Sequence, residues 1–140
     1  MPDDWGYQYE HIHHAFFGNY RLGYLDKDKY NAAKKRGATD FQARRQAIET
    51  LGDANSYADA ADKLAQQRKT LANDKFLTAN ALKTKDGETV FVAIPNVHVP
   101  DDVTQRLSSQ QYRRLIQELS DAADVTSQEI FDATRGIVST

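Results

Sequence analysis

The chain has 140 residues, of which 40% are hydrophobic and 27% charged, with a formal net charge of −2 and no cysteine. This composition predicts one globular domain with its own core and excludes a disordered chain. The lack of cysteine excludes disulfides, thiol catalysis and thiolate metal sites. No apolar run approaches the roughly 20 residues that cross a bilayer, and the opening MPDDWGYQ is unlike a secretory leader. We therefore expect a cytoplasmic protein with no membrane partner.

The first twenty residues favour a helix. Asp4 is a suitable N-cap, and an apolar stripe at helical spacing follows it. The stripe consists of Trp5, Tyr9, Ile12, Phe16 and Tyr20. On such a helix His11, His13 and His14 point in different directions, whereas on a strand His11 and His13 would share one face. The helix is the prediction, and it implies that these histidines bind no common metal ion.

A metal enzyme or nuclease is the third functional hypothesis. The His-Ile-His sequence at residues 11–13 resembles the motif with which a family of DNA-nicking enzymes binds a divalent cation. In those enzymes a helical tyrosine attacks phosphate, a role that Tyr30 or Tyr112 would take here. Three residues make an unspecific match, so the hypothesis extends no further than His11 and His13 as metal ligands.

Eight of the fourteen aromatic residues fall within the first thirty positions. One helix can bury only part of this set, so we expect the others to form an exposed patch that binds another protein. The residues predicted to contact the partner are Trp5, Tyr7, Tyr9, Phe17, Tyr20 and Tyr24. A homo-oligomer is compatible with the same patch.

The middle of the chain is mildly basic. Residues 20–70 carry 11 Lys and Arg against 7 Asp and Glu. This excess supports an alternative function, nucleic-acid binding through residues 27–69. The cations nominated for that surface are Lys34, Lys35, Arg36, Arg44, Arg45, Arg68 and Lys69.

Several helix boundaries in this middle segment are marked in the sequence. Thr39 and Gln42 form a capping box, and Ser56 begins another helix in a similar way. Gly37 follows NAAKKR and Gly52 follows RRQAIETL. Each glycine is predicted to close a helix in the left-handed conformation.

A β-hairpin is predicted after these helices. The segment ETVFVAI alternates, with Val90, Val92 and Ile94 on one side. The Asp-Gly dipeptide at 86–87 is typical of a tight hairpin turn. We predict one hairpin over about residues 76–94, with FLTANALK as the partner strand. Because a lone hairpin is marginally stable, we expect the valine face to pack on the helices.

Two helices are predicted at the C-terminal end. Ser108 with Gln111 and Thr126 with Glu129 are both capping boxes. The spacing of small and apolar residues along the pair is similar to that of a helix-turn-helix. Its second helix, however, would present Glu129 and Asp132 to the phosphates of DNA. An ordinary packed helix pair is therefore the better interpretation.

Together these elements predict an α+β fold, a mainly helical single domain over residues 1–140 with one hairpin and two C-terminal helices. The chain carries no phosphate-binding loop, no Gly-x-Ser-x-Gly and no His-Glu-x-x-His motif. We therefore predict no catalytic residue and no cofactor. Protein binding is the leading functional hypothesis, and nucleic-acid binding is the alternative.

Overall fold

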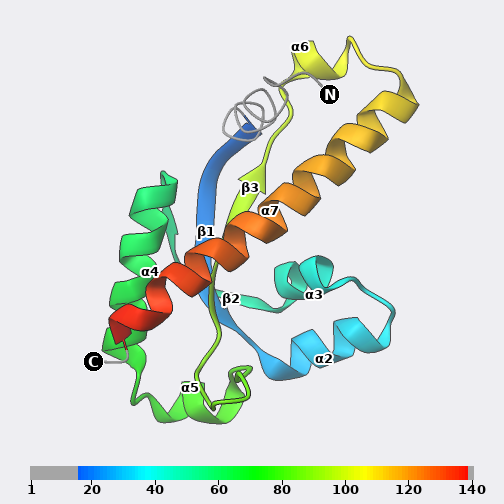
Figure 1. Ribbon diagram of the computed structural model, residues 1–140. Coiled ribbons are helices and arrows are strands. Elements are labelled where there is room, and N and C mark those ends of the chain that lie inside the picture. The colour runs from blue at the N-terminus through cyan, green and yellow to red at the C-terminus, as the bar shows by residue number, and fades with distance from the viewer. Residues whose placement is uncertain (1–15, 139–140) are drawn as a thin grey trace.

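The computed structural model describes residues 16–138. Along the chain lie β1 (Phe17–Leu25), α2 (Lys27–Lys35), α3 (Asp40–Ala47), β2 (Ile48–Ala54), α4 (Tyr57–Leu71), α5 (Lys75–Asn80), β3 (Phe91–Val97), α6 (Asp101–Thr104) and α7 (Ser109–Val138). The predicted α+β, mainly helical fold is confirmed (Figure 1).

The three strands form one antiparallel sheet in the order β2-β1-β3 (Figure 1). β1 lies in the centre because it pairs with both other strands, and its residues from Leu22 to Leu25 are all buried. Its Tyr20 lies opposite Ala54 of β2 and Pro95 of β3. The sheet is therefore assembled from segments that are far apart in the sequence.

The predicted hairpin over residues 76–94 is wrong in its partner strand. Asp74 caps α5 by accepting a hydrogen bond from the backbone N–H of Leu77, so most of FLTANALK is helical. β3 instead pairs with β1 along its whole length. The tight turn itself does form, with Gly87 at a φ of 80°. The residues on its two sides pair through an isolated β-bridge between Lys83 and Thr89, and they do not form two long strands.

β3 is buried on both of its faces. Val92 and Ile94, the predicted core side, are each 2% exposed and pack on residues of the neighbouring helices, as expected. Phe91 and Ala93 on the opposite side are equally buried. Alternation of side chains therefore indicated the strand correctly, but here both faces of the sheet are covered.

Gly23 marks a very close approach of β1 to β2. The register of the two strands shifts between Leu22 and Gly23, which identifies a β-bulge. A Cβ atom at Gly23 would lie 2.0 Å from the backbone oxygen of Glu49. The position therefore requires glycine for lack of space.

One face of the sheet, called the closed face below, packs against α4. Its core consists of Tyr20, Leu22, Tyr24, Ala54, Ala60, Leu64, Leu77, Ala81, Phe91, Ala93 and Ile130. None of these side chains is more than 7% exposed. Ile130 belongs to α7, which contacts both α4 and β3. Two helices therefore cover this core, and an open depression of about 520 Å³ remains beside it between β2 and α4.

The opposite face, called the hollow face below, packs against α2 and α3. Its buried cluster is smaller and consists of Leu25, Ala47, Ile48, Val92 and Ile94. Partly buried apolar side chains complete it: Tyr30, Phe41, Leu82 and Val90. The looser covering leaves open space on this side of the sheet.

The two predicted C-terminal helices are one continuous helix, α7, which runs diagonally across the sheet (Figure 1). The box at its start is confirmed, since the N–H of Gln111 donates to Ser108 Oγ at 3.2 Å. Thr126 lies inside α7, so no helix begins at the second predicted capping box. No glycine or proline interrupts residues 109–135. Across the predicted break, the buried stripe continues through Leu119, Ala123 and Ile130.

Three other helix boundaries are confirmed. The hydroxyl of Thr39 accepts from the N–H of Gln42 at 3.2 Å, and that of Ser56 accepts from the N–H of Asp59 at 3.1 Å. Gly37 takes a φ of 89° directly after α2, as expected for a left-handed helix end.

Two predicted helix ends fall in strands instead. α3 stops at Ala47, and Gly52 lies in β2 rather than after a helix. The predicted N-terminal helix is wrong at its end, because Tyr20 lies in β1. Its earlier part, residues 4–15, lies outside the described residues. In both cases pairing within the sheet overrides a local helical pattern.

Candidate functional site

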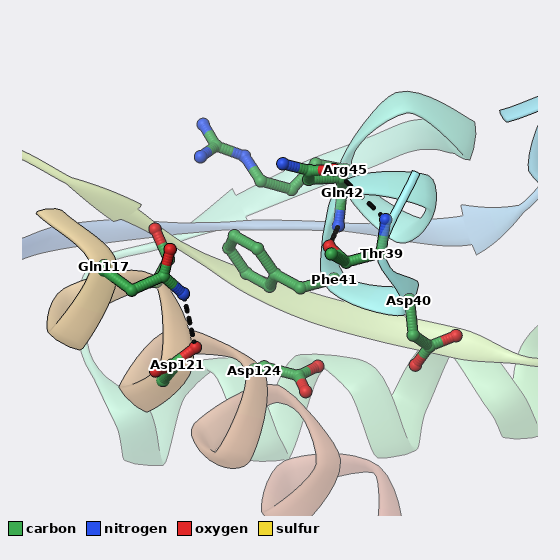
Figure 2. Close-up of a pocket in the computed structure, with 9 residues that line it drawn as sticks. Thr39, Asp40, Phe41, Gln42, Arg45, Gln117, Asp121 and Asp124 are labelled. Carbon is green, nitrogen blue, oxygen red and sulfur yellow. Dashed lines mark hydrogen bonds between the residues drawn. The ribbon is translucent and has the colours of Figure 1, made fainter. Parts of the chain in front are cut away.

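A polar groove lies between α3 and α7 on the hollow face (Figure 2). Its volume is about 310 Å³. The residues that line it are Thr39, Asp40, Phe41, Gln42 and Arg45 from the α3 side, and Gln117, Ser120, Asp121 and Asp124 from α7. Three carboxylates and one guanidinium therefore border the groove.

The start of α3 places an aromatic ring in the groove. The capping box at Thr39 fixes the first turn of α3, and Phe41 follows in that turn. Figure 2 shows the Phe41 ring pointing from α3 toward α7. The Arg45 guanidinium carbon lies 5.5 Å from the ring centroid, a cation–π contact. The ring is only half-buried, so one side of it remains accessible.

The α7 wall of the groove carries two carboxylates one turn apart. The side-chain amide of Gln117 donates to Asp121 at 2.9 Å, and Asp121 is exposed (Figure 2). Asp124 lies deeper, with Oδ1 2.9 Å from Nη1 of Arg44. Among the described residues this Oδ1 accepts no well-aligned hydrogen bond. The charge of Asp124 is nevertheless balanced by Arg44.

A chain of polar contacts behind the groove joins three helices. The Tyr30 hydroxyl of α2 donates to Asp40 Oδ1, and Nε of Arg44 donates to Asp40 Oδ2 at 2.9 Å. Arg44 then reaches Asp124 of α7. The Arg44 side chain is 15% exposed, so its charge is largely desolvated and is balanced by the two carboxylates.

This network sets the protonation of its members. Burial, followed by the hydrogen bond to Asp40, raises the pKa of Tyr30 to about 12. Burial alone would raise the pKa of Asp40, but the hydrogen bonds from Tyr30 and Arg44 outweigh it and lower that pKa below its usual value. Tyr30 is therefore a neutral donor and Asp40 a carboxylate at neutral pH.

An inner cavity of about 270 Å³ lies on the other side of this network. It is lined by Leu25, Tyr30, Asp40, Arg44, Leu82, Thr84, Val90, Val92, Ser127, Gln128 and Phe131. Its floor is apolar sheet, and α7 forms one wall. Asp40 borders both the groove and the inner cavity, so the two spaces share the network as their partition.

The predicted aromatic patch is not assembled within the described residues. Tyr20 and Tyr24 are 3% and 7% exposed and belong to the core of the closed face, where they cannot contact a partner. Phe17 is half-buried at the start of β1. Trp5, Tyr7 and Tyr9 lie outside the described residues, so for them the hypothesis stays a prediction.

Four of the nominated cations gather at the ends of α2 and α3. Lys34, Lys35 and Arg36 are exposed at the end of α2. Nη2 of Arg36 donates to Gln46 Oε1 of α3 at 3.1 Å, next to the exposed Arg45. We call these four cations, Lys34, Lys35, Arg36 and Arg45, the basic corner.

The other three nominated cations lie apart from the basic corner. Arg44 belongs to the network behind the groove. Arg68 is 2% exposed, with Nη1 2.5 Å from Glu88 Oε1 and its guanidinium carbon 4.3 Å from the Phe131 ring centroid. Lys69 is exposed on α4. Arg68 therefore holds α4 to α7 and presents no charge to a ligand.

The predicted metal ligands His11 and His13 lie outside the described residues, and the metal hypothesis stays a prediction. Within residues 16–138, no three His, Asp or Glu side chains group as ligands for a metal ion. In the same part of the chain, no helix has the length and apolar character needed to cross a membrane.

Comparison with protein-family models, with curated proteins and with solved structures finds no match to this chain. Function is therefore argued from the geometry of the site. Sequence reasoning missed the groove because its two walls are about 80 residues apart. A local signal was present for one wall, since the capping box at Thr39 predicts the start of the helix whose first turn contains Phe41.

Proposed function

We propose that this chain is a protein-binding domain whose groove between α3 and α7 takes a partner segment with a basic side chain. The observation that carries the proposal is an accessible aromatic ring, Phe41, beside the exposed carboxylate of Asp121 in one concavity. A lysine or arginine stem can pack on such a ring while its charged end meets a carboxylate.

Charge favours a basic peptide over other ligands of the groove. Asp40 and Asp124 are already paired with Arg44. Asp121 meets only a neutral amide among the described side chains, so its charge is free for a cation. A phosphate group placed next to Asp121 would be repelled by this unpaired carboxylate.

The test is selection of short random peptides on the full chain, followed by fluorescence anisotropy of the peptides recovered. We expect enrichment in Lys and Arg. Asp121→Asn should weaken binding about tenfold, because a charge-assisted hydrogen bond is lost. Phe41→Ala should have an effect of similar size.

Asp132→Asn is the matched control for Asp121→Asn. Asp132 also lies on α7 and accepts the amide of the glutamine four residues before it, at 3.0 Å, but it does not line the groove. This variant should bind like the unmodified chain. Peptides without basic residues, or equal effects of the two substitutions, would contradict the proposal.

Nucleic-acid binding at the basic corner is the second candidate function. It is supported by the exposure of Lys34, Lys35, Arg36 and Arg45 around one helix–helix turn. Binding of a nucleic acid there should weaken steeply as salt rises. Changing Lys34 and Lys35 to alanine should reduce it for every sequence tested. Affinity that is insensitive to salt and to both substitutions would remove this candidate.

A further inference from the structure

The inner cavity of the hollow face carries features of a binding site that are independent of the groove. Leu25 and Val92 form its floor at 1% and 2% exposure, and Phe131 borders it from α7. The floor is rigid, because Leu25 donates to Val90 at 3.0 Å and Leu82 donates back to Leu25 at 2.7 Å. The cavity is therefore a preformed space with mostly apolar walls.

One buried polar group points to a ligand in this cavity. Ser127 of α7 is 1% exposed and lines the cavity. Its hydroxyl finds no hydrogen-bond partner among the residues that the structure describes. A buried hydroxyl without a partner is costly. A bound molecule with one oxygen atom would satisfy it.

The charged groups of the cavity wall are already satisfied by one another. Tyr30 donates to Asp40, and Arg44 pairs with both Asp40 and Asp124. A charged ligand would have to compete with these contacts or lie desolvated beside them. The cavity therefore favours an uncharged molecule.

We propose that the inner cavity binds a small uncharged molecule, largely apolar, whose carbonyl or hydroxyl oxygen hydrogen-bonds with Ser127. A cavity of 150 Å³ holds benzene, so this one of about 270 Å³ accommodates about ten non-hydrogen atoms. A fused bicyclic ketone has this size and chemistry. The proposal does not depend on peptide binding in the groove.

The test uses indan-2-one and its oxygen-free counterpart indane with the full-length chain, followed by NMR of the backbone amides. We expect millimolar indan-2-one to shift the amides of Leu82, Val92 and Ser127. Ser127→Ala should weaken indan-2-one roughly 2- to 10-fold, the range for one neutral hydrogen bond. The same variant should leave the affinity for indane unchanged.

Two further variants keep the test decisive. Ser120→Ala removes a hydroxyl from the same helix on the side of the groove, and it should leave the binding of both probes unchanged. Leu82→Trp places a larger side chain at the half-buried edge of the cavity and should abolish binding of both probes. The Leu82→Trp variant tests the proposal even if Ser127→Ala fails to fold.

The proposal is overturned if the probes shift no amides of the cavity lining in the folded chain. It is also overturned if indan-2-one binds equally well to the unmodified chain, Ser127→Ala and Leu82→Trp. The first result would mean that the cavity holds water alone, and the second that the probe binds elsewhere.

Discussion

The closed and hollow faces of the sheet are both covered by helices, yet they are packed to different degrees. α4 and α7 bury every member of the closed-face core to 7% exposure or less. On the hollow face α2 and α3 contribute Tyr30 and Phe41, which remain half-buried. The groove and the inner cavity lie beside these two side chains. Stability is therefore expected to reside mainly in the closed face, while the hollow face has room to bind.

The largest expected effect comes from the bulge that brings β1 against β2. Gly23→Ala would place a Cβ atom 2.0 Å from the backbone oxygen of Glu49, and we expect it to cost about 4 kcal/mol of unfolding free energy. Gly18→Ala in the same strand is the control, since its Cβ would meet nothing described within 4 Å. Urea unfolding of the two variants checks this, and equal losses would contradict it.

A matched pair of leucines tests the difference between the faces directly. Leu64 of the closed face is fully buried, whereas Leu82 of the hollow face borders the cavity and is half-buried. We expect Leu64→Ala to cost about 3 kcal/mol and Leu82→Ala about 1 kcal/mol, because a smaller new cavity arises beside existing space. Equal losses in denaturant unfolding would show that the two faces are equally packed.

The two arginine networks that anchor α7 provide a third comparison. Glu88 pairs with the buried Arg68 at 2.5 Å and with Arg135 at 3.1 Å. Glu88→Gln leaves Arg68 with an uncompensated buried charge, and we expect a loss of about 2 kcal/mol. Asp124→Asn should cost less, because Arg44 keeps Asp40. Thermal unfolding of both variants tests the order, and the reverse order would be inconsistent with it.

The smallest expected stability effect comes from the phenol of the hollow face. Tyr30→Phe removes the hydrogen bond to Asp40, at about 1 kcal/mol. The folded chain raises the Tyr30 pKa from 10.0 to about 12. The stabilisation is therefore fully present below pH 10 and is lost as pH rises toward 12.

Denaturant unfolding of both chains across this alkaline range gives the measurement. The unfolding free energy of the unmodified chain should exceed that of Tyr30→Phe by about 1 kcal/mol below pH 10. Because a pKa rise to about 12 corresponds to a loss of roughly 2.7 kcal/mol, the two curves should meet and then cross as the pH rises toward 12. If the difference in unfolding free energy between the two chains stays constant up to about pH 12, the fold does not hold Tyr30 in its neutral form.

Much of the fold could be predicted from the sequence because its signals are local. The caps at Thr39, Ser56 and Ser108 and the glycine at 37 depend on contacts within four residues. The β3 segment was identified from its alternation, but its pairing with β1 joins residues about 70 positions apart. The local hairpin signal at 86–87 could not predict this distant pairing.

The candidate site could be predicted only in fragments. Thr126 with Glu129 looked like a helix start, although the buried stripe through Ala123 and Ile130 keeps α7 continuous. That continuity is what carries Asp121 and Ser127 along one helix to the hollow face. Aromatic residues were expected on the surface, yet Tyr20 and Tyr24 lie in the core. The ring that borders the groove is the half-buried Phe41, which lies in the first turn after the capping box at Thr39.

We propose that the partner binds on the hollow face, in the groove between α3 and α7. An NMR titration of the full-length chain with a selected basic peptide tests it most directly. We expect shifts concentrated at residues 39–45 and 117–124, the two walls of the groove. Shifts concentrated on the outer surface of α4, with both walls unchanged, would contradict it.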